Sequence, residues 1–178
     1  PDGDKTEKVI KEETLNSMKA IWTRDKKEIS DEEYDEFYQH ISHDWTPPLT
    51  RLHVKLEGAT EYSALLYIPS RPPFDFFYRE HKHGVQLYSK RVFIMENCKE
   101  LMPPYLSFIK GVVDAPDLNL NVSREILQQD VLVRNIRKNL VKKILELLAG
   151  MEKEKYDQFF KAFGPIFKTG VSTDYENK

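Results

Sequence analysis

A stripe of apolar side chains towards the C-terminal end constrains the fold more than any other feature of this sequence. It recurs at every fourth position and consists of Leu132, Ile136, Leu140, Ile144 and Leu148. This spacing predicts an amphipathic helix that begins after Ser123, runs for about six turns and ends at Gly150. Because one face of such a helix has to be buried, the stripe also predicts a second layer of structure to cover it.

The middle of the chain supplies that layer as a series of strands. Apolar alternation and turn residues predict four strands, over residues 52–58, 61–69, 85–95 and 108–115. The first strand places Leu52, Val54 and Leu56 on one face. Since only a short turn around Gly58 separates the first two strands, we expect them to form an antiparallel hairpin.

Two further helices are expected on either side of these strands. Ser30 and Glu33 form a capping box at the start of one helix, which Pro47 prevents from continuing. A second amphipathic segment, over residues 156–167, is predicted to pack back on the long helix. The fold class predicted from these patterns is α/β, with a small mostly antiparallel or mixed sheet followed by a helical segment.

Composition limits the function classes that the chain can belong to. Its 178 residues carry a formal charge of −2, so there is no electrostatic case for nucleic acid or a membrane surface as a partner. The single cysteine, Cys98, excludes an internal disulfide framework and a zinc site built from several cysteines, and it is compatible with a reducing compartment. No apolar run approaches the length of a bilayer span.

Both ends of the chain have the composition of exposed connecting segments. Residues 1–14 are charged and are interpreted as the remnant of a linker, and residues 171–178 as a tail. We therefore expect the chain to be one piece of a longer protein.

Arg124 is the first candidate for a function, because it lies where a polar loop enters the long helix. The N-terminus of a helix carries partial positive charge, so a cation there is mildly unfavourable unless an anion faces it. Arg124 could neutralise a phosphate as an arginine finger does, or it could simply be solvated or paired with Glu125. Gln128 lies one turn further on the same face and could orient a water or a phosphate oxygen, while Asn121 could hold the loop.

The sequence contains no glycine-rich loop that could cradle a phosphate. If Arg124 meets a nucleotide, another domain or another chain must therefore bind that nucleotide.

Aromatic residues are the second group of candidates. The loop after the second strand contains Phe74, Phe76, Phe77 and Tyr78, which either anchor the loop to the core or form an exposed patch for partners. The polar residues that follow Trp22 predict that this side chain is exposed, and Trp45 has the same two alternatives.

Histidine pairs suggest no metal site. His81 and His83 share one face of an extended segment, and His40 and His43 share one face of a helix. Neither pair has an evident third ligand, so we predict solvated histidines and no metal.

Four segments of the sequence resemble one family in the order in which that family has them. "LNLNVSREILQQDVLVRNIRKNLVKKILELL" resembles the catalytic-loop segment of the heat-shock protein 90 chaperones. "IWTRDKKEISDEEYDEFYQHISHDWTPPL", "LLYIPSRPPFDFF" and "LYSKRVFIMENCKELMPPYLSFIKGVVDAPDL" are similar to the rest of that family's middle domain. The resemblance covers roughly residues 15 to 170, and it is greater to the bacterial branch, the high-temperature protein G chaperones.

The resemblance implies a domain plan and a fold. The fold is a layered α/β/α sandwich with a small mixed sheet, followed by a helical segment. The plan is a linker remnant over 1–14, an α/β core with the catalytic loop at its end over 15–122, the long helix with the packed-back helix over 123–170, and a tail over 171–178.

It also implies an activity for the full-length protein, namely that of a cytoplasmic, ATP-driven chaperone of the heat-shock response. ATP with Mg would bind in a separate N-terminal domain, and the isolated piece would be inactive alone. Arg124 would reach the γ-phosphate, supported by Gln128 and Asn121. The alternative is a protein-interaction module without a catalytic contribution.

The expected partners follow from the same resemblance. They are the N-terminal ATPase domain, partly folded client proteins, co-chaperones, and a second copy bound through a C-terminal domain; neither nucleic acid nor a membrane is expected. The residues implied in client binding are Trp22, Phe74, Phe76 and Phe77.

Overall fold

A five-stranded mixed sheet forms the centre of the molecule. The computed structural model describes residues 20–78, 82–119 and 123–177. The strands are β1 (Thr50–Leu56), β2 (Tyr62–Ile68), β3 (Val85–Ser89), β4 (Val92–Cys98) and β5 (Lys110–Asp114). They are arranged in the order β1-β2-β5-β3-β4, and all neighbours are antiparallel except β3 and β5. The predicted β1–β2 hairpin is confirmed.

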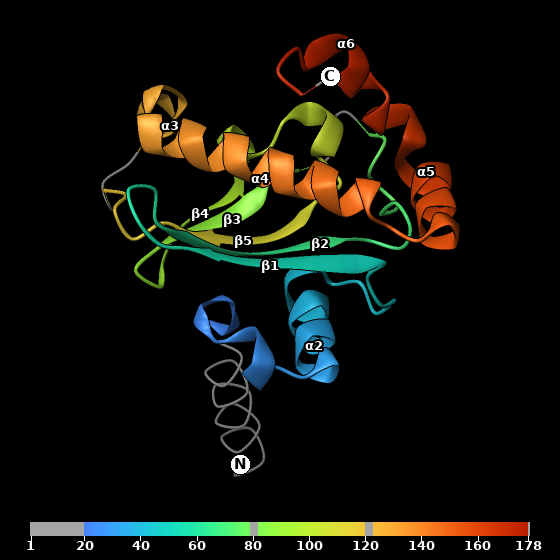
Figure 1. Cartoon of the computed structure of the whole chain (residues 1–178), viewed down its shortest axis with the longest axis horizontal. Helices are drawn as coiled ribbons and strands as arrows, with labels where there is room; N and C mark the ends of the chain where they lie inside the picture. Colours follow the sequence, from blue (N-terminus) through green and yellow to red (C-terminus); the bar gives the residue numbers. More distant parts are fainter. Residues whose placement is uncertain (1–19, 79–81, 120–122, 178) are drawn as a thin grey trace, which may run out of the picture.

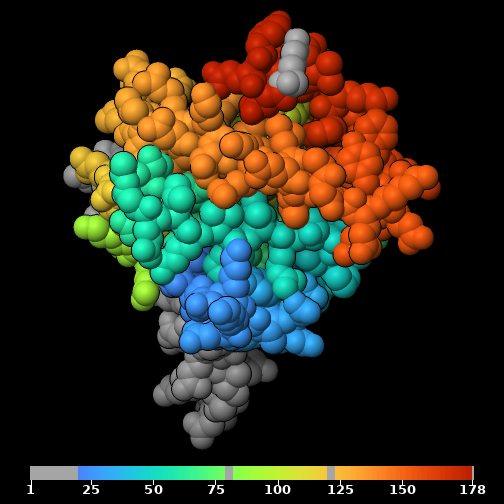
Figure 2. Space-filling view, in the orientation of Figure 1, coloured from blue at the N-terminus to red at the C-terminus, as the bar shows by residue number. Residues whose placement is uncertain are grey.

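Helices cover both faces of this sheet, so the predicted α/β/α layering is confirmed (Figure 1). On one face lie the short helices η1 (Ile21–Thr23) and η2 (Lys26–Glu28), followed by α2 (Asp31–Ser42). The C-terminal helices are α3 (Arg124–Gln129), α4 (Val131–Ala149), α5 (Lys153–Phe167) and α6 (Thr169–Thr173). The turns η3 (Lys99–Leu101) and η4 (Pro104–Leu106) connect β4 to β5. Figure 2 shows edge strand β1 between orange α4 and blue α2.

The sheet separates two hydrophobic cores because side chains alternate along its strands. On β2, Ala64 and Leu66 belong to the core shared with α4 and α5, whereas Leu65 and Tyr67 belong to the core shared with α2. Val54 on β1 belongs to the core on the α4 side, and Leu52 and Leu56 pack against the same core, so the three share one face as the sequence predicts. A strand that is buried on both faces leaves little freedom in register, since a shift by one residue would exchange the two cores.

The predicted long helix is interrupted, which corrects the expectation of one continuous helix. Ile136, Leu140 and Ile144 are buried against the sheet as the stripe predicts. Asp130, however, ends α3 and starts α4, because its carboxylate accepts hydrogen bonds from the backbone N–H groups of Leu132 and Val133 at 2.7 and 3.3 Å. An aspartate that caps the following turn competes with helical continuation at its own position.

The predicted third strand over residues 85–95 is wrong, since this segment forms a hairpin of two strands. Lys90 and Arg91 form the turn between β3 and β4, with φ angles of 49° and 65°. Two consecutive residues with positive φ suit the two-residue turns of hairpins, but such turns usually contain Asn or Gly. Lysine and arginine in this turn therefore concealed it from sequence patterns.

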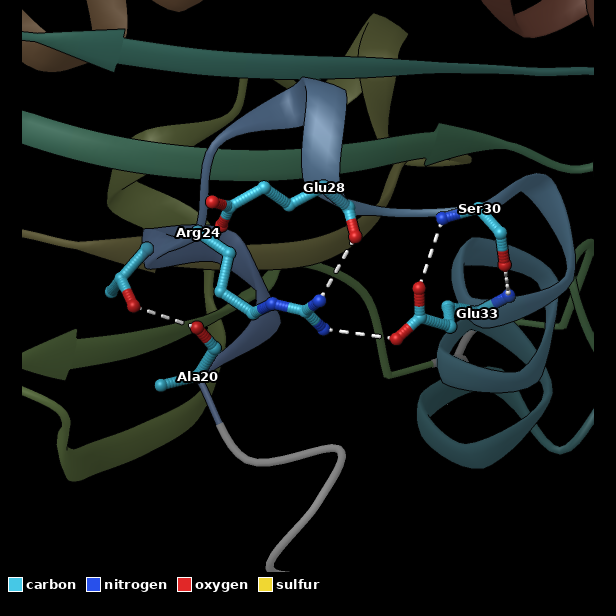
Figure 3. A network of polar contacts seen from close by, with 6 residues as sticks. Ala20, Arg24, Glu28, Ser30 and Glu33 are labelled. Carbon is cyan, nitrogen blue, oxygen red and sulfur yellow. Dashed lines mark hydrogen bonds and ion pairs between the residues drawn. The ribbon is translucent and has the colours of Figure 1, made fainter.

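Polar contacts fix the segment that precedes α2, as Figure 3 shows. The Arg24 guanidinium donates to Glu33 Oε1 and to the Glu28 carbonyl, both at 3.0 Å. The predicted capping box is present, with Glu33 N–H donating to Ser30 Oγ and Ser30 N–H donating to Glu33 Oε2. The charged residues after Trp22 therefore tie η1 and η2 to the start of α2.

A buried carboxylate at the end of β5 connects three segments that are distant in sequence. Asp114 is 4% exposed, and its Oδ2 accepts hydrogen bonds from Trp22 Nε1 and from the Arg91 backbone N–H, each at 3.0 Å. A buried charge is tolerated only where donors of this kind replace water. Asp114 therefore holds η1 and the β3–β4 turn to the centre of the sheet.

We expect Asp114→Ala to lower the free energy of unfolding by about 2–4 kcal/mol, because two buried donors lose a charged acceptor. Trp22→Phe removes the indole N–H donor, which should cost about 1–2 kcal/mol, and also part of the buried ring, which adds a packing cost. Urea unfolding followed by circular dichroism measures both. Equal stability of Asp114→Ala and the parent chain would contradict the assigned role.

Candidate functional site

Arg124 is the first residue of α3, and its guanidinium lies against the end of β4. Nη1 donates to the Asn97 carbonyl at 3.4 Å and Nη2 to the Glu96 carbonyl at 3.3 Å. Nη1 is also 3.7 Å from Glu100 Oε2. These contacts are long, and half of the Arg124 side chain remains exposed. The guanidinium is therefore held loosely and can exchange these acceptors for a stronger anion.

Glu100 is the better-buried partner of this pair, with 11% of its side chain exposed. The Cys98 thiol donates to Glu100 Oε2 at 3.5 Å. Burial, together with the nearby Glu100 carboxylate, raises the pKa of Cys98 to about 12, so the thiol stays protonated. Glu100 is therefore the more constrained side chain of the pair, and Arg124 is the more exposed one.

The other two residues predicted to act with Arg124 differ in what the structure says of them. Gln128 is exposed and lies four residues after Arg124 on α3, hence on the same helical face. Asn121 lies outside the described residues, and its role stays a prediction. Ser123 caps α3, as the sequence predicts, by accepting a hydrogen bond from the Ile126 N–H.

Trp22 is buried, so the expectation of an exposed side chain is wrong. It is 3% exposed, and its ring centroid lies 4.7 Å from that of Tyr88 and 5.9 Å from that of Phe37. Its carbonyl faces His53 Nε2 at 2.9 Å. Ile21 and Trp22 of the single-turn helix η1 are both buried, whereas the side chains of Asp25, Lys26 and Lys27 that follow are exposed. Trp45, by contrast, is 82% exposed.

The aromatic loop after β2 divides into an anchor and an exposed patch. Phe76 is 7% exposed and packs edge-on against Phe163 of α5, so this residue corresponds to the core-anchor alternative. Phe74, Phe77 and Tyr78 are 94%, 69% and 63% exposed. Three exposed aromatic side chains within five residues are an unusual use of apolar surface in a monomer and are typical of contact sites.

Histidines and acids do not gather into a metal site in the part of the chain that the structure describes. No group of three or more His, Cys, Asp or Glu side chains there could hold a metal ion. His53 is instead a structural residue, buried between Tyr34 and Trp22. His81 lies outside the described residues.

Comparisons with known proteins place this arrangement in a family. The family model described as Hsp90 protein matches residues 2–178. The chain is 58% identical over 180 residues to the chaperone protein HtpG of Nocardia farcinica and 55% identical to that of Geobacter sulfurreducens. These alignments cover 98% and 99% of the chain but 28% of each relative. The chain belongs to the Hsp90 family.

A solved structure of a heat shock protein domain shares the fold. The middle domain of a putative heat shock protein of Plasmodium falciparum matches with a TM-score of 0.77 and 29% identity, over 88% of this chain and 62% of that one. The resemblance that the sequence suggests is therefore confirmed at the level of family and fold. Since the chain spans little more than a quarter of its bacterial Hsp90 relatives, their whole length includes segments that it does not match.

Sequence patterns do not indicate two acidic residues that are important in this Hsp90 chain. Glu100, which faces Arg124, lies in a segment whose prolines predict only a broken helical turn. Asp114 is the last residue of an apolar strand, and in the sequence it looks like an ordinary polar strand end. Neither has a periodic or motif signal, because each acquires its partner from a distant part of the chain.

No helix of this Hsp90 chain, over the ranges that the structure describes, combines the length and apolar character needed to cross a membrane.

We expect the stability of the chain to fall with acidification through His53. Burial lowers the pKa of His53 below its ordinary value of 6.5. Its Nε2 faces a carbonyl and therefore carries the proton, while Tyr34 donates to Nδ1. The unfolded chain consequently binds a proton more readily, so the free energy of unfolding decreases as the pH falls below 6.5.

Urea unfolding at several pH values tests this, with His53→Gln as the comparison. The variant should be less dependent on pH in this window than the parent chain. Identical slopes for the two proteins would exclude His53 as the titrating group.

Proposed function

We propose that this chain is the middle domain of an ATP-dependent molecular chaperone and that it supplies Arg124 to the γ-phosphate of ATP bound by another domain. The observation that carries this proposal is the loosely held, half-exposed guanidinium beside β4. The chaperone name of the HtpG relatives supports the wider role. A cytoplasmic location, dimerisation through a C-terminal domain and co-chaperone binding belong to the same proposal.

The residues present fit an anionic group such as a triphosphate that approaches from outside. Arg124 offers a planar fork of donors, and its present acceptors are two carbonyls at long distance and one carboxylate. The sequence has no glycine-rich loop, so the same chain is not proposed to hold the nucleotide. Bound ATP with Mg would supply the phosphoryl group that is transferred to water.

Arg124 would act by electrostatic stabilisation. Its guanidinium moves from the β4 carbonyls towards the oxygens on which negative charge develops, and its fork geometry orients them. Gln128, on the same face of α3, can donate to a phosphate oxygen or to the attacking water. No proton transfer is assigned to Arg124, because a guanidinium stays protonated in proteins.

Glu100 would hold Arg124 back in the absence of nucleotide. The guanidinium has to leave the Glu100 carboxylate before it can reach a phosphate, and this costs about 1 kcal/mol or less for a half-exposed pair at 3.7 Å. The contact is thus weak enough to be broken during each cycle and strong enough to lower the basal rate.

We expect Arg124→Ala to reduce ATP turnover of the full-length protein, by a factor on the order of 10³ where an arginine finger acts at full strength. Arg124→Lys should recover only part of the rate, because an ammonium keeps the charge but lacks the planar pair of N–H donors of a guanidinium. A coupled ATPase assay measures both, with Arg134→Ala on the exposed side of α4 as the control. Unchanged turnover in Arg124→Ala would exclude the proposed role.

A substitution at Glu100 is expected to raise ATP turnover in the same assay, whereas Arg124→Ala lowers it. Glu100→Gln should raise basal turnover by up to about fivefold, which corresponds to the weak pair that it removes. Glu125→Gln, an exposed neighbour of Arg124, serves as the matched charge control. A lower rate in Glu100→Gln would show that Glu100 positions Arg124 rather than restrains it.

A second function, the binding of partly folded clients, is favoured by the exposed aromatic side chains of the loop after β2. Phe74, Phe77 and Tyr78 offer apolar surface that the folded chain itself does not use. Trp22 and Phe76 were expected to take part, but both are buried, so we confine the proposed contact to the exposed aromatics. This function is compatible with catalysis and also stands alone as the alternative.

We expect Phe74→Ser with Phe77→Ser to weaken binding of a reduced and carboxymethylated protein, which stays unfolded, by at least about tenfold. Basal ATP turnover should not change, since neither residue lies at Arg124. Val171→Ser, at a position 71% exposed on α6, controls for loss of apolar surface in general. Fluorescence anisotropy measures the affinity, and equal affinity in the double variant would contradict a client site on this loop.

A further inference from the structure

A groove runs beneath the C-terminal end of α2, and neither of the proposed functions accounts for it. It consists of two adjoining cavities of about 660 and 450 Å³, whose walls share Ser42, His43 and Lys110. The groove exists because α2 packs on β5 and β2, while β3 and β4 extend beyond the helix on the same side of the sheet. Each cavity alone has the size of an ordinary ligand pocket.

Lys110 lies where the two cavities meet. Its side chain makes no hydrogen bond or ion pair with any residue that the structure describes, although the Asp75 carboxylate is near enough to interact electrostatically. Burial lowers the pKa of Lys110 below 10.5. Among the described residues its three N–H donors have no hydrogen-bond acceptor, which is costly for a half-buried ammonium, and a carboxylate that accepts from them relieves that cost.

Charged side chains of both signs line the groove around Lys110. Lys82 and Glu96 line the larger cavity, and Arg71, which pairs with Asp44 at 3.8 Å, lines the smaller one. Asp44, the nearest acid in the wall of the smaller cavity, already accepts hydrogen bonds from Tyr38 and from the Thr46 N–H. Its carboxylate is therefore engaged and does not satisfy Lys110.

Apolar surface flanks the cation on both sides. Phe93, which is 50% exposed, and Tyr88 line the larger cavity. Phe74, Pro72 and Pro73 line the smaller one. A ligand that contacts Lys110 and the apolar walls of both cavities therefore needs a negative group between two apolar groups. Its chain must be long enough to join the two cavities.

We propose that this groove binds an extended segment of an unfolded client in which an Asp or Glu side chain, flanked by large apolar residues, pairs with Lys110. The proposal rests on the client-binding function above and deepens it, because it names the sequence pattern that is selected. Phe74 links the groove to the exposed loop, so one client segment can contact both. Native proteins expose such mixed apolar and acidic segments mainly when they are unfolded.

Anisotropy titrations of the full-length protein with two labelled short peptides test the inference. One peptide carries a central Asp between Leu and Phe residues, and the other is identical except for Asn at the centre. The parent protein should bind the Asp peptide about tenfold more tightly, and added salt should reduce this ratio. Lys110→Met should abolish the ratio, Lys110→Arg should retain it, and Lys142→Met on the opposite layer should leave it unchanged.

The outcomes separate this inference from client binding in general. The groove assignment is overturned if folded Lys110→Met still prefers the Asp peptide. It is also overturned if the parent protein shows no preference for the Asp peptide. If Phe74→Ser then still weakens both peptides equally, client binding by the loop survives without Lys110. If the parent protein binds a permanently unfolded protein and neither peptide, the proposed pattern is likewise wrong. Thermal unfolding of each variant verifies that it is folded.

Discussion

The carboxylate of Asp114 is the contact on which the rest of the architecture depends. It lies at the end of the central strand β5, and it draws Trp22 from the N-terminal segment and the β3–β4 turn to the same oxygen. Both donors go to Oδ2, while the buried Oδ1 has no hydrogen-bond partner among the described residues, so loss of either donor would leave this carboxylate still less satisfied. The docking of η1 in turn places Trp22 against Tyr88 and Phe37, which completes the core beneath α2.

The candidate catalytic residue and the candidate client groove meet at the end of β4. The backbone carbonyls of Glu96 and Asn97 accept hydrogen bonds from Arg124, while the same two residues line the groove below α2. Asn97 has a φ angle of 52°, so the strand departs from regular geometry here. An arginine on one side of the sheet and a peptide groove on the other are therefore separated by a single irregular strand end.

Much of the local structure could be predicted, because it depends on neighbours in sequence. Ser30 and Glu33 form the expected capping box, and the α4 stripe is buried as its spacing requires. The interruption of the long helix at Asp130 was missed although its cause is local, whereas two other failed expectations depend on distant contacts. Trp22 was expected to be exposed from its polar neighbours, but Asp114, 92 residues away, provides the partner that buries its indole. The β3–β4 turn was missed because tertiary contacts hold Lys90 and Arg91 at positive φ.

The sequence by itself determined the fold class, the capped start of α2 at Ser30, the family and the identity of Arg124 as a candidate, since periodicity, capping and motif resemblance all depend on consecutive residues. Only the tertiary structure decided which aromatic residues are exposed, which carboxylate faces Arg124 and that Lys110 lines both cavities of the groove. The physical reason is that burial and ion pairing are properties of surfaces brought together from distant segments, and no local pattern encodes which surfaces will meet.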